Sequence, residues 1–402
     1  MSESTADVRE GRDDAPAHLN AFRDETRAWL EANCPPGVRN PPEGEDNTVW
    51  GGRNVVFKND DQRLWLERMA AKGWTVPEWP KAYGGGGLSS DEAKVLGQEM
   101  KRIGAQPALS SLGIWMLGPA LLKFGTEAQK LEHLPKIARG EIRWAQGYSE
   151  PGSGSDLASV QTRGVDMGDY FLVNGSKIWT SFGDKCDMIF ALVRTEPDAP
   201  KHQGISFLLL DMADPGVTTR PIRLIYGDSS FTQTFFDDAK APKKDLIGER
   251  GGGWKVCQYL LSHERSMMAG PQTSNRTPET LSAHAVRVLG PGELARSGAL
   301  RADILQHEMD AWVMGIAMER NRDLAKANEL APTAASFLKL SGTELAKKRA
   351  ELLLAVDGVG GFDAHAAASQ DWLRTPVLTI AGGSSEIQLN VIAKRALGLP
   401  GA

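Results

Sequence analysis

Residues 170–181 read Tyr-Phe-Leu-Val-Asn-Gly-Ser-Lys-Ile-Trp-Thr-Ser, and they decide how the middle of the chain is interpreted. Aromatic and β-branched residues flank Asn174-Gly175, a dipeptide typical of two-residue hairpin turns. We therefore predict a β-hairpin that turns at Asn174-Gly175. Further short runs rich in β-forming residues cover 187–194, 204–211 and 231–236. Together they predict a small β-domain that ends near Pro242.

Helical periodicity lies on both sides of this β-domain. Residues 17–144 carry apolar side chains at helical spacing. Downstream, 254–268, 304–329 and 333–357 each predict a long helix, Pro332 separates the last two, and a final helix follows Ser385. Helices, then strands, then helices favour three successive domains over a doubly wound sheet. We place these domains at residues 1–145, 146–245 and 246–402.

The composition narrows the class of protein. The 402 residues are 41% apolar and 24% charged, which is ordinary for a globular protein with room for a large cofactor. A net charge of −5 argues against nucleic acid as a partner. The polar N-terminus does not resemble a signal peptide, and no long apolar run predicts a membrane span. Cys34, Cys186 and Cys257 are widely spaced, so we expect reduced thiols in a cytoplasmic protein and no metal site.

The helix that follows Gly253 carries a candidate catalytic base. Five residues step by three and four along one face of this helix: Trp254, Cys257, Leu261, Glu264 and Met268. Glu264 is the acidic member of this apolar stripe. Desolvation favours the neutral form of a carboxyl group, which makes a buried glutamate a useful base near neutral pH. An ion pair with Arg265 or with a more distant basic residue is the alternative.

Three loops could approach a ligand closely. Residues 149–156 read Ser-Glu-Pro-Gly-Ser-Gly-Ser-Asp, and such a loop can direct backbone N–H groups toward a pyrophosphate. The indole within Trp179-Thr180-Ser181 could stack on a flat ring. The glycines of residues 381–386, Ala-Gly-Gly-Ser-Ser-Glu, leave room for close contact. An inter-domain turn, ordinary β-packing and a helix N-cap, respectively, explain the same three loops without a ligand.

Taken in this order, the segments resemble the acyl-CoA dehydrogenase family from about Leu19 to Pro400. The matching segments are 148–156, 174–181 and 383–388, the last reading Gly-Ser-Ser-Glu-Ile-Gln. The resemblance implies an α+β multidomain fold with a helical N-terminal domain, a central β-barrel and a C-terminal four-helix bundle. FAD would lie between the β-domain and the bundle, and subunits would associate through the bundle.

The resemblance also implies which residues would contact FAD. Tyr148 and Ser149 would contact the flavin ring, and Ser155 would lie near the bound ligands. Trp179 and Ser181 would pack against the isoalloxazine, with the Ser181 hydroxyl near N5. From the C-terminal loop, Ser384 and Glu386 would approach the FAD.

Many family members carry the catalytic glutamate in the C-terminal loop, where this chain has Gly382. A branch that acts on branched or long acyl chains places the base on the bundle helix before an arginine, and His263-Glu264-Arg265 matches that pattern. The resemblance therefore implies that Glu264 removes the α-proton. The Gly382 backbone N–H and a ribityl hydroxyl of FAD would hydrogen-bond the thioester carbonyl. The β-hydride would move to the flavin, and the electrons would pass to an electron-transfer flavoprotein.

The expected function is FAD-dependent dehydrogenation of an acyl-CoA thioester to the 2-enoyl-CoA, with a bulky acyl group such as a steroid side chain. A pimeloyl-like dicarboxylyl-CoA dehydrogenase, an acyl-CoA oxidase and a non-catalytic flavin-sharing subunit are the alternatives. Two family features that reach a neighbouring subunit's FAD are missing: an Arg-containing Phe-Gly segment after the base helix, and a Gln followed by Gly-Gly, where residues 355–360 of this chain read Ala-Val-Asp-Gly-Val-Gly. We therefore expect a related partner chain, as in an α2β2 assembly, and no nucleic-acid or membrane partner.

Overall fold

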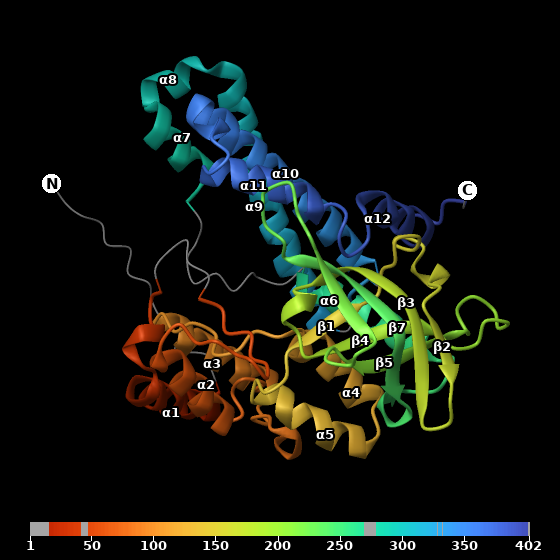
Figure 1. Ribbon diagram of the computed structural model, residues 1–402. Coiled ribbons are helices and arrows are strands. Elements are labelled where there is room, and N and C mark those ends of the chain that lie inside the picture. Colours follow the sequence, from red (N-terminus) through yellow and green to blue (C-terminus); the bar gives the residue numbers. More distant parts are fainter. Residues whose placement is uncertain (1–15, 42–46, 269–278, 328, 332, 401–402) are drawn as a thin grey trace. The chain divides into compact units, whose positions relative to one another are not determined.

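The computed structural model describes residues 16–41, 47–268, 279–327, 329–331 and 333–400, with side chains described for these residues except 262–268, 325 and 326. Contacts divide the chain into two compact units. The first contains Met1–Gln146, Lys185–Phe190 and Leu209–Ala213, and the second contains Gly147–Asp184, Ala191–Leu208 and Asp214–Ala402. As predicted, the elements run from helices through strands to helices (Figure 1).

Helices dominate the start of the chain. They are α1 (Ala17–Asn33), α2 (Asp60–Ala71), α3 (Ser90–Arg102), α4 (Gly118–Phe124) and α5 (Glu127–Ala138), with short turns at η1 (Pro36–Val38), η2 (Lys81–Tyr83) and η3 (Gly113–Leu117). Capping boxes begin α3 at Ser89 and α5 at Thr126. Leu30, Trp65 and Met69 form the core between these helices. The amphipathic spacing seen in the sequence is the direct cause of this packing.

The β-domain is one eight-stranded sheet in the order β6-β7-β3-β2-β4-β5-β8, with β1 paired to β4. Its strands are β1 (Trp144–Gly147), β2 (Arg163–Asp166), β3 (Tyr170–Ser181), β4 (Met188–Arg194), β5 (Ile205–Asp211), β6 (Val217–Ile222), β7 (Phe231–Pro242) and β8 (Leu246–Ile247). Short turns are η4 (Leu157–Ser159), η5 (Gly183–Lys185) and η6 (Lys243–Asp245). β3 is central because it pairs antiparallel with both β2 and β7.

The predicted hairpin turn at Asn174-Gly175 is wrong. Residues 170–181 form a single strand, β3, which pairs with β7 on both sides of that dipeptide. The register shifts beside Asn174-Gly175 because β7 carries one extra residue between Phe236 and Ala239, and Asn174 and Asp238 exchange two hydrogen bonds of 2.9 Å there. Gly175 has φ +144°, and a Cβ there would come within 2.7 Å of Thr162 Oγ1. Close approach between strands, and not chain reversal, therefore requires this glycine.

The C-terminal part is helical. It contains α6 (Gly253–Met268), α7 (Leu281–Leu289), α8 (Pro291–Arg296), α9 (Gly298–Lys326), α10 (Ala334–Asp357), α11 (Ala367–Leu378) and α12 (Ser385–Val391), with turns at η7 (Gly358–Phe362) and η8 (Ile392–Ala396). The three predicted long helices and the helix after Ser385 are confirmed. α10 contacts α6, α7, α9, α11 and α12, so it organises this region. Among the helices described, none is both long and apolar enough to cross a membrane.

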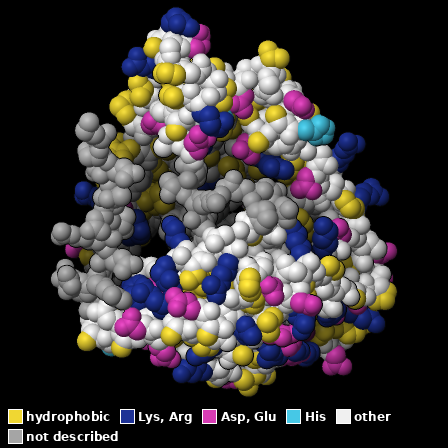
Figure 2. All heavy atoms as spheres, turned by 90° about the vertical axis from the view of Figure 1, so that its left-hand side faces the viewer, with side chains coloured by type: hydrophobic (Ala, Val, Ile, Leu, Met, Phe, Trp, Pro, Cys, Tyr) yellow, Lys and Arg dark blue, Asp and Glu magenta, His cyan; other side chains and the backbone are white. Residues whose placement is uncertain are grey.

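An uncovered apolar stripe runs along α9. Leu305, Met309, Trp312, Val313 and Ile316 recur at helical spacing, and each is between 46% and 71% exposed. Figure 2 shows hydrophobic side chains interspersed with charged ones over the upper part of the molecule, where Figure 1 labels α7 and α8. A contiguous exposed apolar face on a helix is typical of a surface that another chain covers.

A buried carboxylate joins α1 to α3 in the first unit. Glu99 is 2% exposed and accepts hydrogen bonds from Arg23, Arg27 and Arg102 at 2.7–3.2 Å. Burial alone would raise the pKa of Glu99, but the three guanidinium groups outweigh it and hold the pKa at about 2. Because three cations converge on one carboxylate, we expect this cluster to fix α1 against α3.

Glu99→Gln tests that expectation. We expect the free energy of unfolding at pH 7 to fall by about 3 kcal/mol, because three arginines lose their common counter-charge. The folded pKa of Glu99 lies below its usual 4.5, so its stabilisation is complete above that pH and is lost as the pH falls through about 2. Urea titrations of both proteins should therefore converge in acid. Glu67→Gln, which breaks an exposed pair with Arg63, should cost less than about 1 kcal/mol.

Candidate active site

The Ser-Glu-Pro-Gly-Ser-Gly-Ser-Asp loop is a compact structure rather than an open turn. Glu150 and Ser153 exchange two backbone hydrogen bonds of 2.9 Å, and the Ser153 hydroxyl donates to Asp156 O at 2.9 Å. Gly152, Gly154 and Ser155 remain exposed on its outer side. Tyr148, just before the loop, is buried with its ring edge-on to Phe207 at 6.3 Å. The loop therefore has a fixed backbone with small exposed residues.

A buried ion pair lies under this loop. Lys177 Nζ donates to Glu150 Oε1 at 2.7 Å and to Tyr148 O at 3.2 Å. Glu150 Oε2 also accepts from Gln161 N at 2.6 Å, and Oε1 accepts from Thr162 N at 2.9 Å. Burial lowers the pKa of Lys177 to about 8, while the Glu150 charge acts in the opposite direction. The sequence analysis missed both members of this pair.

Trp179 has an unusual backbone conformation at the end of β3. A second bulge separates Lys177 from Thr180, and Trp179 within it adopts φ +63°. The indole is 53% exposed and meets the Phe231 ring edge-on at 6.2 Å. A left-handed backbone is costly for a bulky residue and is concentrated at functional sites. The bulge turns the aromatic face outward, where it can contact a ligand.

A pocket of about 500 Å³ opens beside this strand end. Ser181 and Phe182 of the strand end line one side together with Phe231. Arg349 of α10 and Arg374 of α11 line the other side, and Arg374 stacks over the Tyr226 ring at 4.9 Å. The lining is mostly apolar and contains two arginines and one carboxylate, Asp371, so that it suits a large planar ligand and carries a net positive charge. Among the residues predicted to contact a cofactor, Ser181 lines this pocket.

The C-terminal loop is held from two helices. Lys339 of α10 donates from Nζ to Gly383 O at 2.7 Å, and Gln388 of α12 donates to Gly382 O at 3.2 Å. Gly382 and Gly383 adopt φ +65° and +94°, and a Cβ on Gly383 would come within 2.6 Å of Gln388 Nε2. Glycine is therefore needed for the conformation of this loop. Burial lowers the pKa of Lys339.

The two predicted residues that follow this loop begin α12. The Ser384 hydroxyl caps the helix by accepting from Ile387 N at 3.4 Å. Glu386 is exposed, and hydrogen bonds from its own backbone N–H and from Ser384 lower the pKa of its carboxyl group. The helix cap anticipated from the sequence is thus present, and both side chains lie at the N-terminal end of the helix.

α6 presents a slightly different face from the one predicted. Val256, Cys257 and Leu260 are buried, whereas Trp254 and Leu261 are only half-buried. The helix begins against β5, where a Cβ on Gly253 would come within 2.5 Å of Ser206 C. The Glu264 side chain lies outside the described residues.

Asp357 has an intrachain partner. His284 of α7 and Asp357 at the end of α10 are 2.6 Å apart between Nε2 and Oδ1. The other ring nitrogen of His284 lies 2.8 Å from an Arg287 nitrogen, and Arg287 pairs with Glu279 at 2.9 Å. One residue of the 355–360 stretch, which lacks the family's Gln-Gly-Gly pattern, is therefore engaged within this chain.

Comparison with known proteins identifies the family. Profiles of the acyl-CoA dehydrogenase N-terminal, middle and C-terminal domains match residues 16–141, 145–239 and 251–397. The acyl-CoA dehydrogenase IpdE1 of Mycobacterium tuberculosis is 36% identical over 396 residues, which is 95% of this chain and 98% of that protein. The chain belongs to the acyl-CoA dehydrogenase family.

Two solved structures of acyl-CoA dehydrogenases are similar over nearly the whole chain. The Tcur3481-Tcur3483 steroid ACAD is 30% identical, with a TM-score of 0.74, over 96% of this chain and 99% of that one. The ChsE4-ChsE5 complex of Mycobacterium tuberculosis is 27% identical, with a TM-score of 0.69, over 97% and 100%. Both contain two named proteins. The acyl-CoA dehydrogenase fold expected from the sequence is confirmed.

Membership of the acyl-CoA dehydrogenase family defines the general reaction of this chain. The chain is a flavoprotein oxidoreductase of the acyl-CoA dehydrogenase family, and the reaction is dehydrogenation of an acyl-CoA. Members of the family typically depend on FAD. Tyr148 and Lys177 are joined by a hydrogen bond, Ser181 lines the pocket, and Ser384 caps α12. The predicted residues of this acyl-CoA dehydrogenase therefore lie on several elements of the second unit.

The sequence analysis missed three polar residues whose side chains hold the loops of the site in place: Lys177, Lys339 and Gln388. Lys177 follows Phe171 and Val173 with the same strand parity, so its inward position was visible in the alternation. Lys339 and Gln388 support the glycine loop from helices distant from it in sequence. Their contacts depend on tertiary structure, so the sequence carried no comparable signal for them.

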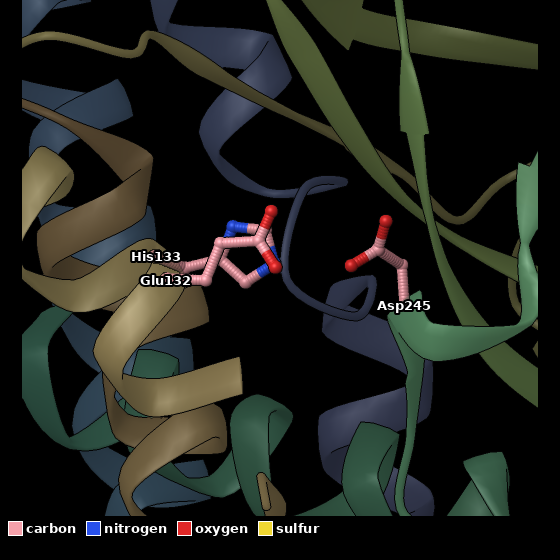
Figure 3. A group of neighbouring side chains, drawn as sticks. All are labelled: Glu132, His133 and Asp245. Atoms are coloured by element: carbon pink, nitrogen blue, oxygen red, sulfur yellow. The ribbon is translucent and has the colours of Figure 1, made fainter. Parts of the chain in front are cut away.

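Three polar side chains elsewhere come from two elements. Glu132 and His133 lie on α5, and Asp245 lies in η6 (Figure 3). Glu132 and His133 belong to the first unit and Asp245 to the second, so they are described separately. Cys34, Cys186 and Cys257 form no disulfide.

Trp179→Asn tests whether the left-handed backbone at this position is strained. Asparagine tolerates that conformation, so the substitution should relieve strain while it removes one edge-on ring contact. We expect the free energy of unfolding of the flavin-free protein to stay constant or to rise by up to about 1 kcal/mol. Chemical denaturation measures it. Trp372→Asn, at an exposed helical position, should instead be destabilising, and a large loss for Trp179→Asn would show that Trp179 is a packing anchor.

Proposed function

We propose that this chain uses FAD to dehydrogenate a bulky acyl-CoA thioester to the 2-enoyl-CoA. The observation that carries the proposal is the pocket of about 500 Å³ between the end of β3 and helices α10 and α11. Its volume lies within the range of about 300–1,000 Å³ typical of small-molecule sites. It adjoins a strand end at which Trp179 is turned outward by a bulge.

The residues present fit a flavin dinucleotide. Phe182 and Phe231 offer apolar contact for a planar ring, and Ser181 offers a hydroxyl at its edge. Arg349 and Arg374 outnumber the one lining carboxylate, Asp371, and this net positive charge suits an anionic cofactor. Tyr148, Ser149, Ser155, Ser384 and Glu386 are proposed to contribute further contacts.

In the proposed mechanism, Glu264 is the base that removes a proton from the substrate. Its carboxylate would take the α-proton of the thioester. The Gly382 backbone N–H would donate a hydrogen bond to the thioester carbonyl and stabilise the developing negative charge. Bound FAD supplies the two-electron acceptor for the β-hydride. Lys339 and Gln388 would keep the Gly382 loop in place through their bonds to its carbonyl groups.

A bulky acyl group is supported by two observations. Gly382 stands where a catalytic carboxylate often lies in the family, so the loop leaves space beside the reacting carbons. A solved relative with 30% identity is a steroid ACAD. We therefore propose a steroid side-chain CoA ester as substrate, and an electron-transfer flavoprotein as electron acceptor. A panel that includes dicarboxylyl-CoA esters, and assays with oxygen, distinguishes the alternative dehydrogenase and oxidase activities.

Glu264→Gln is the direct test of the base. We expect FAD to stay bound, while the rate of anaerobic flavin bleaching by a reactive acyl-CoA falls about 10²–10⁴-fold, because general-base catalysis is removed. Stopped-flow absorbance measures the rate in whichever assembly retains the flavin. Glu351→Gln, at an exposed position on α10, should react like the wild type. Equal rates for Glu264→Gln and the wild type would remove Glu264 from the mechanism.

A related partner chain is the second part of the proposal. Asp357 is engaged by His284 within the chain, which leaves it poorly suited to contact a neighbour's cofactor. The apolar stripe on α9 is uncovered. Two similar solved structures each name two proteins, Tcur3481-Tcur3483 and ChsE4-ChsE5. We propose an α2β2 assembly in which a related dehydrogenase chain covers this stripe and completes the flavin site.

Co-purification tests the partner. We expect the chain alone to hold less than one FAD per chain, and co-expression with a dehydrogenase encoded beside it to restore flavin and turnover. Trp312→Glu should weaken this assembly because it places a charge in the stripe, whereas Val56→Glu, at another exposed apolar position, should not. Light scattering and flavin absorbance measure both. One FAD per chain with full turnover by the lone protein would rule out the heteromer.

A further inference from the structure

The charged side chain of Lys177 is fully buried in the middle of the sheet. Lys177 has no exposed surface, and its Nζ reaches Glu150 Oε1 at 2.7 Å and Tyr148 O at 3.2 Å. The surrounding charged and titratable groups are Glu150 in the loop, Arg194 on β4 and Cys257 on α6. The lysine therefore joins a strand to a loop that precedes it by nearly thirty residues.

Glu150 also links the loop and β3 to the residues that lead into β2. Its carboxylate accepts backbone hydrogen bonds from Gln161 and Thr162, and the residue is 8% exposed. The Ile178 N–H donates to Ser149 O at 2.8 Å, directly beside the ion pair. Three segments thus meet at one buried pair: the Tyr148–Glu150 segment, the approach to β2, and β3.

Stability alone does not account for such a pair. Two charges removed from water lose hydration that their attraction only partly restores, and apolar replacements of similar volume are often as stable. Burial lowers the pKa of Lys177 to about 8, which reflects that cost. A buried pair that contributes little net stability can instead define a unique arrangement of the segments it joins.

The pair lies between two sets of residues that are proposed to contact the cofactor. Lys177 holds the carbonyl of Tyr148, and Ser149 follows in the chain. On the strand side, Trp179 and Ser181 come two and four residues after Lys177. A shift of the loop relative to β3 would therefore displace Tyr148 and Ser149 from their positions relative to Trp179 and Ser181.

We propose that the Lys177–Glu150 ion pair positions the flavin-facing surface by locking the Tyr148–Ser149 backbone against the strand that carries Trp179 and Ser181. This inference rests on the proposed function, because it assumes that these residues contact FAD. Lys177 and Glu150 are positioning residues and do not touch the reacting atoms. Their effect is transmitted through the Tyr148 carbonyl and the β3 backbone.

The test is the paired substitution Lys177→Met with Glu150→Gln, made in the assembly that holds the flavin. Both side chains keep their approximate size, and neither leaves a single buried charge behind. We expect a folded protein whose FAD dissociation constant rises by at least about tenfold, with a shifted visible flavin spectrum and a shifted flavin reduction potential. The FAD dissociation constant should rise because the binding surface is no longer held in its bound arrangement before FAD binds, so that binding itself must order it.

The matched control is Lys243→Met with Asp166→Asn. This pair joins an exposed lysine to a carboxylate at 2.9 Å on the same domain. We expect its FAD affinity, flavin spectrum and potential to equal those of the wild type. Lys177→Gln with Glu150→Gln is the second variant, should the first double substitution not fold. It keeps an oxygen for the Gln161 and Thr162 N–H groups, retains a hydrogen-bonding group at each position and leaves no buried charge unpaired.

The outcomes separate this inference from the proposed function. A folded variant of either kind that binds FAD with wild-type affinity, spectrum and potential would overturn the positioning role and leave a purely structural ion pair. A wild-type assembly that binds no FAD would instead overturn the proposed function. Lys177→Arg keeps the positive charge, so it should recover part of the lost affinity if positioning through Glu150 is the cause.

Discussion

The pairing of β3 with β7 is the constraint on which the site depends. The pairing runs from Tyr170 opposite Pro242 to Ser181 opposite Phe231, with a bulge before Thr180. In a regular strand, Lys177 and Trp179 would point to the same face. The bulge changes that parity, so that Lys177 and Thr180 are both buried while Trp179 turns outward. One strand thereby supplies a buried anchor, an exposed ring and a pocket hydroxyl within five residues.

The overall order of helices and strands was predictable from the sequence, because the spacing of apolar residues follows the buried face of each element. The long helices 254–268, 304–329 and 333–357 appeared close to their predicted bounds. The hairpin prediction at Asn174-Gly175 failed because β3 runs straight through this dipeptide and pairs with β7 on both sides of it, with the extra residue on β7. The buried face of α6 was shifted by about one position, because contact with β5 and not the stripe alone orients the helix.

The candidate site was less accessible to sequence reasoning. The order of the loops indicated the family, and Ser181 lines the pocket. The anchors Lys177, Lys339 and Gln388 act across long sequence separations, so their roles needed coordinates. Two local preferences are also violated close together: an aromatic residue with φ +63° and a buried lysine two residues earlier. Such conflicts persist where surrounding structure compensates and function benefits.

Two features of the C-terminal helices bear on how this chain assembles with others. Asp357 closes onto His284 within the chain, and the adjacent α9 keeps its apolar stripe uncovered. In a symmetric pair of copies each surface occurs twice, so a contact that one copy does not supply is missing from both. In the proposed α2β2 assembly, a related chain with a different residue in this segment would restore the contact on one side. The intrachain His284–Asp357 contact is consistent with that proposal, and an assembly of unlike chains would hold fewer flavins than chains.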